Sequence, residues 1–241
     1  MRTYGLRFDV NCSILFTELP LLRRPAAAKA AGFDGVEFWW PWDAMVPSDK
    51  EADAFVSAIR DAGVELVSLN FHTGDMAAGE RGLVSVPSAA KAFRENIEAC
   101  SEIARRTGKT LMIHDREAHS DVLAILAEYA PWRPYSVIFH CFSGDADMAR
   151  ACAEAGYVMS FAGNVTFKNA DALREAALVA PAELLLAETD APYLTPVPHR
   201  GKPNSPAMTA HTVRFLASLK NLDLADFCAT LQATGSRVFA W

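Results

Sequence analysis

Three residues that could bind a divalent metal ion lie near the ends of short apolar segments. His114 and His140 stand near the ends of two such segments, and Asp190 comes two residues after a third. Two imidazoles and one carboxylate suit Zn²⁺ and similar ions, and three protein ligands leave coordination positions open for a substrate. We therefore predict that His114, His140 and Asp190 hold one divalent ion, which could be Zn²⁺, Mg²⁺ or Mn²⁺.

Weaker candidates follow other apolar segments. Asp9, Asn11 and His72 could add a metal ligand, and Glu37 and Asp190 are the carboxylates that could take part in catalysis. Each of the weaker candidates also has a plainer interpretation. Glu37 could be an ordinary polar residue beside the site, and His72, in the string NFHTGD, could form hydrogen bonds within its own loop.

The elements that must position these side chains alternate along the chain. The expected strands are 4–10, 33–39, 64–71, 110–114, 136–141, 157–161 and 184–188. The expected helices are 17–31, 49–62, 88–107, 119–130, 145–155 and 169–180, followed by two near 206–220 and 223–239. Strands that alternate with helices pair in parallel through right-handed crossovers. The pattern predicts an α/β fold, a TIM-like (βα) barrel with seven clear strands and an eighth missing or replaced, whose polar residues gather at the carboxyl ends of the strands.

Composition narrows the class of protein. The 241 residues are 51% hydrophobic and carry a formal net charge of −6, which argues against a surface that coats nucleic acid but leaves room for a nuclease. No apolar segment reaches the roughly 18–20 residues of a membrane span. We expect a cytoplasmic protein with no membrane partner, no obligate nucleic acid and reduced thiols, because its cysteines are odd in number and scattered: Cys12, Cys100, Cys141, Cys152 and Cys228.

From about Gly108 to its end, the chain resembles the last half of the TatD-type metal-dependent deoxyribonucleases. The matching strings are KTLMIHDREAH, VIFHCFSG, MSFAGNVTFKNA, LLLAETDAPYLTPVPHRGKPNSPA and the closing SRVFAW. The resemblance implies hydrolysis of a phosphodiester at the end of a DNA strand, with paired metal ions. It also implies that His114, His140 and Asp190 are metal ligands and that His199 and Arg200 lie beside the path of the substrate phosphate. Arg116 is a third candidate for that contact.

The first part of the chain departs from that family. A TatD enzyme begins with a His-x-His pair on its first strand and carries a metal-bridging glutamate on its fourth. Here Asp9-Val10-Asn11 occupies the place of the pair, and no strand with the bridging glutamate precedes residue 109. Residues 1 to about 107 instead resemble hydroxypyruvate isomerase, a xylose-isomerase-like TIM barrel, through ILFTELPLLRR, AAAKAAGFDGVEFWWPWD, AIRDAGVELVSLNFHTGDMAAGERGLVSVP and FRENIEAC.

These two resemblances suggest a fusion of two barrel fragments, 1–107 and 108–241, joined within a helix near 105–109 into a single barrel domain. The main interpretation is an engineered chimera without selected catalytic activity, because half of the TatD ligands and most of the isomerase constellation are missing. The alternative is a weakened metal-dependent phosphodiester hydrolase of the TatD type. A barrel with an unfilled position leaves strand edges exposed, so we also expect a homodimer through such an edge.

Overall fold

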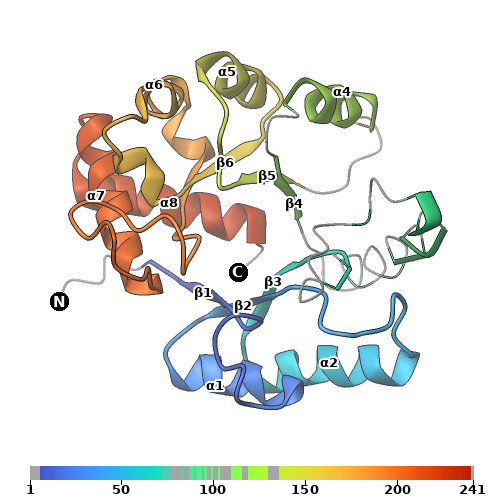
Figure 1. Ribbon diagram of the computed structural model, residues 1–241. Helices are drawn as coiled ribbons and strands as arrows, with labels where there is room; N and C mark the ends of the chain where they lie inside the picture. Colours follow the sequence, from blue (N-terminus) through green and yellow to red (C-terminus); the bar gives the residue numbers. More distant parts are fainter. Residues whose placement is uncertain are drawn as a thin grey trace. The chain divides into compact units, whose positions relative to one another are not determined.

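The computed structural model describes residues 6–72, 74–75, 83, 87–89, 91–93, 95–96, 99, 103, 110–115, 119–129 and 136–239 (Figure 1). Most of the helix expected over 88–107, the expected seam at 105–109 and the candidate Arg116 lie outside these residues. The chain divides into two compact units, Arg7–Lys109 and Thr110–Trp241 together with Leu6. A fusion of two fragments near 105–109 stays a prediction. Closure of the two units into one barrel stays a prediction.

The first unit is built on a small parallel sheet. Its strands are β1 (Asp9–Asn11), β2 (Gly35–Phe38) and β3 (Glu65–Leu69), paired in the order β1-β2-β3. Two helices follow the first two strands, α1 (Arg24–Ala30) and α2 (Asp49–Ala62), and a short 3₁₀ turn covers Pro87–Ala89. All three strands lie within the expected segments or overlap them, but they are shorter.

Helix α2 has the bounds that the sequence predicts, because both of its ends are specified locally. Ser48 accepts a hydrogen bond from the Glu51 amide while the Glu51 side chain accepts one from the Ser48 amide, and Gly63 ends the helix with a φ of 66°. Its buried face carries Phe55, which meets Phe38 of β2 edge-on at a centroid distance of 5.0 Å. The contact ties the helix to the sheet.

The helix expected over 17–31 is wrong at its start. Regular helix begins only with the 3₁₀ turn Leu21–Arg23 and continues as α1. Pro20 disfavours a helical conformation for the residue before it. The preceding loop is instead held by Arg24, whose guanidinium donates to the carbonyl oxygens of Cys12 (3.0 Å) and Leu19 (3.0 Å).

The second unit contains a four-stranded parallel sheet. Its strands, in the order β4-β5-β6-β7, are β4 (Leu111–His114), β5 (Val137–His140), β6 (Val158–Phe161) and β7 (Leu185–Ala187). The helices are α4 (His119–Tyr129), α5 (Ala146–Glu154), α6 (Asp171–Val179), α7 (Thr209–Leu219) and α8 (Leu224–Phe239). Short 3₁₀ turns cover Gly163–Thr166, Ala182–Leu184 and Pro206–Met208. The prediction of an α/β fold with parallel sheets is confirmed.

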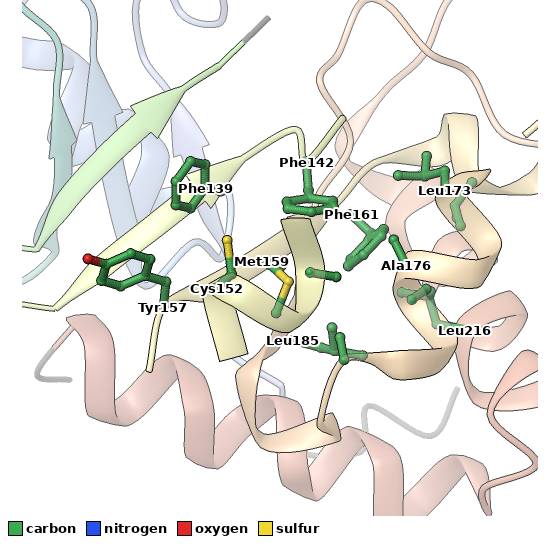
Figure 2. Packing of buried hydrophobic residues seen from close by; sticks show 14 of the residues in the cluster. Phe139, Phe142, Cys152, Tyr157, Met159, Phe161, Leu173, Ala176, Leu185 and Leu216 are labelled. Atoms are coloured by element: carbon green, nitrogen blue, oxygen red, sulfur yellow. The ribbon is translucent and has the colours of Figure 1, made fainter. Parts of the chain in front are cut away.

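The core of the second unit lies between this sheet and its helices. Figure 2 shows Phe139, Phe142, Phe161 and Leu216 packed together, all at most 2% exposed. All four residues of β6 are buried, as expected for an inner strand of a parallel sheet that is covered on both faces. Burial also raises the pKa of the Cys152 thiol to about 12, so this cysteine stays a protonated core residue at neutral pH.

Lys220, directly after α7, closes the end of a neighbouring helix. Its Nζ donates to the carbonyl oxygens of Ala177 (2.8 Å), Leu178 (3.1 Å) and Ala180 (2.7 Å), at the C-terminal end of α6. These carbonyls have no partner within the helix, and a cation is favoured at that end by the helix dipole. Burial lowers the pKa of Lys220, which is the cost of placing the ammonium there.

We expect Lys220→Met to lower the free energy of unfolding by about 1–3 kcal/mol, because it leaves these carbonyl oxygens without their charged donor. Lys50→Met, on the exposed surface of α2, is the matched control and should change stability by less than about 0.5 kcal/mol. Denaturant unfolding of the two variants measures the difference. Equal stability of both would show that the Lys220 contacts contribute nothing.

Among the residues that the structure describes, no helix combines the length and apolar character needed to cross a membrane.

Candidate metal centre

The chemistry-bearing side chains of the second unit gather where β5 and β7 end. His140 is the last residue of β5, Glu188 directly follows β7, and Asp190 begins the loop after it. One ligand atom from each of these three residues lies within 4.8 Å of the others. Because β5, β6 and β7 run in parallel, their carboxyl ends meet at one edge of the sheet and bring the three side chains together.

The contacts of His140 determine which ring nitrogen can bind a metal ion. Its Nδ1 lies 3.0 Å from Glu188 Oε2 and 2.9 Å from Oε1, so Nδ1 carries the proton and donates to this carboxylate. In the neutral ring with its proton on Nδ1, the other nitrogen, Nε2, holds a lone pair, and it lies 4.0 Å from Asp190 Oδ1. A carboxylate that orients a histidine in this way is the usual outer partner of a metal-binding imidazole.

Glu188 is held in its ionised form by its neighbours. Burial disfavours the charge, but the His140 ring, the Ser160 hydroxyl and the Cys141 amide together outweigh it and keep the pKa of Glu188 below its usual range. The Cys141 amide donates to Oε2 at 3.1 Å. Cys141 adopts a φ of 48°, a left-handed conformation that places this amide beside the carboxylate. Glu188 was not among the candidates from the sequence.

Asp190 sits in a partly desolvated position. Burial and the nearby Glu188 carboxylate raise its pKa, while His140 and His114 lower it without cancelling the rise. Its φ of 53° makes a tight turn, in which the Tyr193 amide donates to the Asp190 carbonyl at 2.8 Å. The buried Asn204 secures this loop by donating to the carbonyl of Thr189 at 2.8 Å. A carboxylate that resists ionisation by itself is stabilised when a cation binds beside it.

His114 lies next to this group but outside it. In the sheet register His114 pairs with His140, and their ring centroids are 5.5 Å apart. Its side chain is exposed to solvent. The structure thus brings His140 and Asp190 together as the sequence predicts, adds Glu188, and leaves His114 at the border. A role for His114 as a ligand stays a prediction.

A second histidine–carboxylate pair follows β4. Asp115 is buried, and the His119 Nδ1 of α4 contacts its carboxylate. The Ser143 hydroxyl, from the loop after β5, donates to the Asp115 carbonyl at 2.9 Å. These contacts hold the loops after β4 and β5 together beside His140.

The remaining ligand candidates belong to the first unit. Asp9 and Asn11 are the ends of β1, and Glu37 pairs with Asn11 in the sheet register. Asn11 uses its side-chain oxygen to accept the Ser13 amide at 2.8 Å, which closes a turn. Within the residues described for this unit, the candidates form no group with the spacing of a metal site.

His72 is occupied by its own loop. Its Nδ1 accepts the Gly74 amide at 2.9 Å, so the proton is on Nε2, which lies 3.3 Å from the Asp43 carbonyl. The His72 amide donates to the buried side chain of Asn96 at 2.8 Å. The Gly74 contact is of the kind that the loop role predicts, and a role for His72 as an additional ligand stays a prediction.

The loop with the string PVPHRG carries two further candidates. His199 meets His211 of α7 edge-on, with ring centroids 4.7 Å apart. Burial, His199 and Arg214 lower the pKa of His211. The Arg200 guanidinium lies 3.8 Å above the centroid of the Phe167 ring. Both side chains belong to the loop that begins at Asp190, which places them on the same connection as the candidate metal centre.

Comparison with known proteins identifies the family. The family model described as "TatD related DNase" matches residues 39–240. "Uncharacterized metal-dependent hydrolase TatD" of Mycobacterium tuberculosis is 46% identical over 177 residues, which covers 70% of this chain and 65% of that protein. "Uncharacterized metal-dependent hydrolase YcfH" of Escherichia coli K12 is 37% identical, over 73% of this chain and 66% of that protein. The chain thus spans about two thirds of the length of these relatives.

A different relative matches a smaller share. "Putative hydroxypyruvate isomerase" of Streptomyces coelicolor is 54% identical over 108 residues, or 44% of this chain and 39% of that protein. Since this share and that of the mycobacterial hydrolase together exceed the chain, the two likenesses overlap. The family match from residue 39 likewise reaches far ahead of Gly108, where the motifs place its beginning.

Solved structures show the same fold. YjjV, a TatD homologue from Escherichia coli K12, superposes with a TM-score of 0.64 at 20% identity and covers 98% of both chains. An AP endonuclease of family 2 from Brucella melitensis superposes with a TM-score of 0.55 at 21% identity, over 90% of this chain and 89% of that one. At such identities the likeness concerns the fold alone.

Proposed function

The chain belongs to the TatD-related DNase family, and from this premise we propose that it is a metal-dependent hydrolase that cleaves phosphodiester bonds at the end of a DNA strand. The observation that carries the proposal is the pairing of His140 Nδ1 with Glu188, which turns Nε2 toward Asp190. This proposal replaces the interpretation of the chain as a scaffold without activity, which the comparisons favour less.

The donor set fits a divalent cation. A neutral imidazole nitrogen and a carboxylate are offered side by side, with the pKa of Asp190 raised by burial in a way that a bound cation would relieve. We infer that His140 Nε2 and Asp190 hold the ion and that His114 completes the set from β4. When bound, such an ion supplies Lewis-acid polarisation of a phosphoryl oxygen and makes water more acidic.

Side chains of the protein orient the metal ligand, hold the loops of the centre and supply charge for the substrate. Glu188 fixes the tautomer and orientation of the His140 ring through its hydrogen bond to Nδ1. Asn204 holds the loop that carries Asp190, and Ser143 anchors the loop after β5 to Asp115. Arg200, with Arg116 as a further candidate, supplies positive charge for the substrate phosphate. These roles extend the resemblance residue by residue and are proposals.

We further propose a single ion and a weakened activity. The His-x-His pair of the family is replaced by Asp9-Val10-Asn11 in this chain. Among the described residues, only His140, Glu188 and Asp190 form a group with the spacing of a metal site. The isomerase likeness over 44% of the chain supports a composite origin for the N-terminal part. Deliberate construction and dimerisation through a strand edge stay predictions.

The proposal is tested with a single-stranded oligonucleotide labelled at its 5′ end. Chelator-treated protein receives Zn²⁺, Mg²⁺ or Mn²⁺ in turn, and shortening from the 3′ end is followed on a gel. We expect ion-dependent shortening that is lost in the His114→Ala/His140→Ala double variant. If the folded, ion-loaded native protein left the oligonucleotide intact, the proposed activity would be overturned. The interpretation as a protein without selected catalytic activity would then be favoured again.

A further inference from the structure

A recess in the second unit lies beside the loop that carries Asp190. It has a volume of about 670 Å³, and its lining joins the loop after β6, helices α6 and α7, and the loop after β7. The residues that matter for what it could bind are Phe167, Lys168, Arg174, Val197, Arg200 and Phe215. The recess thus combines two aromatic rings with three cations.

The cations of the recess differ in how far they are already engaged. Arg174 donates to the carbonyl oxygens of Phe167 (2.5 Å) and Lys168 (3.3 Å), and it forms an ion pair with Asp171. These bonds hold the Arg174 side chain in place as part of the lining of the recess. In the described part of the chain, no carboxylate forms an ion pair with Lys168 or Arg200, and both side chains are exposed. Two cations therefore remain available for an anionic ligand.

Arg200 presents a flat surface rather than a point charge. Its central carbon lies 3.8 Å above the centroid of the Phe167 ring, so one side of the guanidinium is in contact with that ring. The ring face attracts the cation and favours this position. Nucleobases stack on arginine planes and aromatic rings with little regard to sequence. Because Arg200 is exposed to solvent, a base can reach the side of the guanidinium that Phe167 does not contact.

The loop after β7 both carries Asp190 and lines the recess. The Thr166 hydroxyl accepts the Val197 amide at 2.9 Å, which ties the loop after β6 to the loop after β7. Gly163 approaches the Leu194 carbonyl so closely that a Cβ at this position would lie 2.2 Å from its oxygen. A strand held in the recess would therefore be positioned by the same loop that begins at Asp190.

We propose that this recess is a nucleotide subsite for single-stranded DNA. One base stacks on the open face of Arg200, supported by Phe167, while its phosphate is bound by Lys168 and Arg200. The inference rests on the proposed function for the identity of the polymer. It deepens that function, because it assigns to Arg200 the recognition of a base in addition to a phosphate.

The test measures binding without cleavage. Chelator-treated full chain is titrated into a fluorescent oligothymidylate, and the same is done with an oligonucleotide of equal length whose sugars lack bases. We expect Arg200→Lys, which keeps the charge but loses the plane, to weaken oligothymidylate binding about 10-fold, since stacking on a side chain contributes on this scale. Binding of the abasic strand should change less than about twofold. Arg150→Gln, on the exposed surface of α5, is the matched control and should change neither.

The phosphate contact is tested by Arg200→Gln. We expect this variant to lower the slope of log affinity against log salt concentration by about 0.7, the value for one phosphate of a single strand. Equal weakening of both strands by Arg200→Lys, or native affinity for both, would overturn the inference. If the native chain hydrolyses DNA but the Arg200 variants bind it as well as the native chain does, the inference fails and the proposed function stands. If binding depends on Arg200 but the native chain hydrolyses no DNA, the proposed function alone fails. Melting curves establish that each variant is folded.

Discussion

Asp190→Asn should reduce ion-dependent DNA hydrolysis by roughly 10³-fold, because an ion that stabilises the transition state by several kcal/mol loses its only carboxylate ligand in the proposed set. The substitution keeps the volume of the side chain and removes its charge. Rates of 3′-end shortening, measured for both proteins at an ion concentration that saturates the native chain, give the loss.

Asp147→Asn is the matched control for this experiment. Asp147 is an exposed carboxylate in the first turn of α5, paired with Arg150 at 2.6 Å, and its replacement should leave the rate unchanged. If the Asp190 variant retained more than about a tenth of the native rate, Asp190 would not be a ligand of a catalytic ion. An equal loss in both variants would indicate a general effect of charge on DNA binding.

The second large effect concerns Glu188, which acts through His140. We expect Glu188→Gln to weaken ion binding about 10- to 100-fold, the usual consequence of removing the partner that orients a metal-binding histidine. Because the native pKa of Glu188 is lowered, its contribution to stability is present above the ordinary glutamate pKa and is lost as pH falls through the folded value. The stability difference between native and variant should therefore shrink in acid.

Glu154→Gln, at the exposed end of α5, controls for the change of charge. It should alter neither the ion affinity nor the way in which stability falls at low pH. Ion affinity is followed by calorimetry and stability by melting at a series of pH values. Retention of native ion affinity by Glu188→Gln would show that the His140 ring needs no carboxylate to orient it. A stability difference that stays constant down to low pH would contradict the ionised state of Glu188.

The elements around the centre could be predicted from the sequence because their signals are local. The apolar runs before His114 and His140 place both residues at strand ends, where the structure has them. Helix α2 is specified by its own capping residues. The helix expected from residue 17 is wrong because the tertiary contacts of Arg24 hold the preceding loop open.

Glu188 could not be identified in the same way, although one signal pointed to it. It is the last residue of the expected strand 184–188, and polar residues at the carboxyl ends of strands are the ones that the fold brings together. Its role, however, depends on His140 Nδ1 and the Cys141 amide, which come from a different strand. The sequence shows neither contact. For His72 the sequence offered hydrogen bonding within its own loop, and the Gly74 contact is of that kind, but the contact of Nε2 with the Asp43 carbonyl, 29 positions earlier, could not be foreseen.

The extent of the family likeness was also underestimated from motifs. Strings such as HCFSG and ETDAPYL place its beginning near Gly108, whereas the family match starts at residue 39. Motifs gather where chemistry constrains the residue types, whereas a fold can be shared where the side chains differ. The N-terminal part therefore resembles hydroxypyruvate isomerase in its sequence motifs, while most of it is also covered by the TatD-related family match.

The most direct test of the metal centre is calorimetric titration of the chelator-treated chain with Zn²⁺ and with Mn²⁺. We expect that one ion binds per native chain and that Asp190→Asn and His140→Ala each abolish the binding while the protein stays folded. A folded native chain that takes up neither ion would contradict the centre at His140 and Asp190. Binding that both variants retain would place the ion elsewhere.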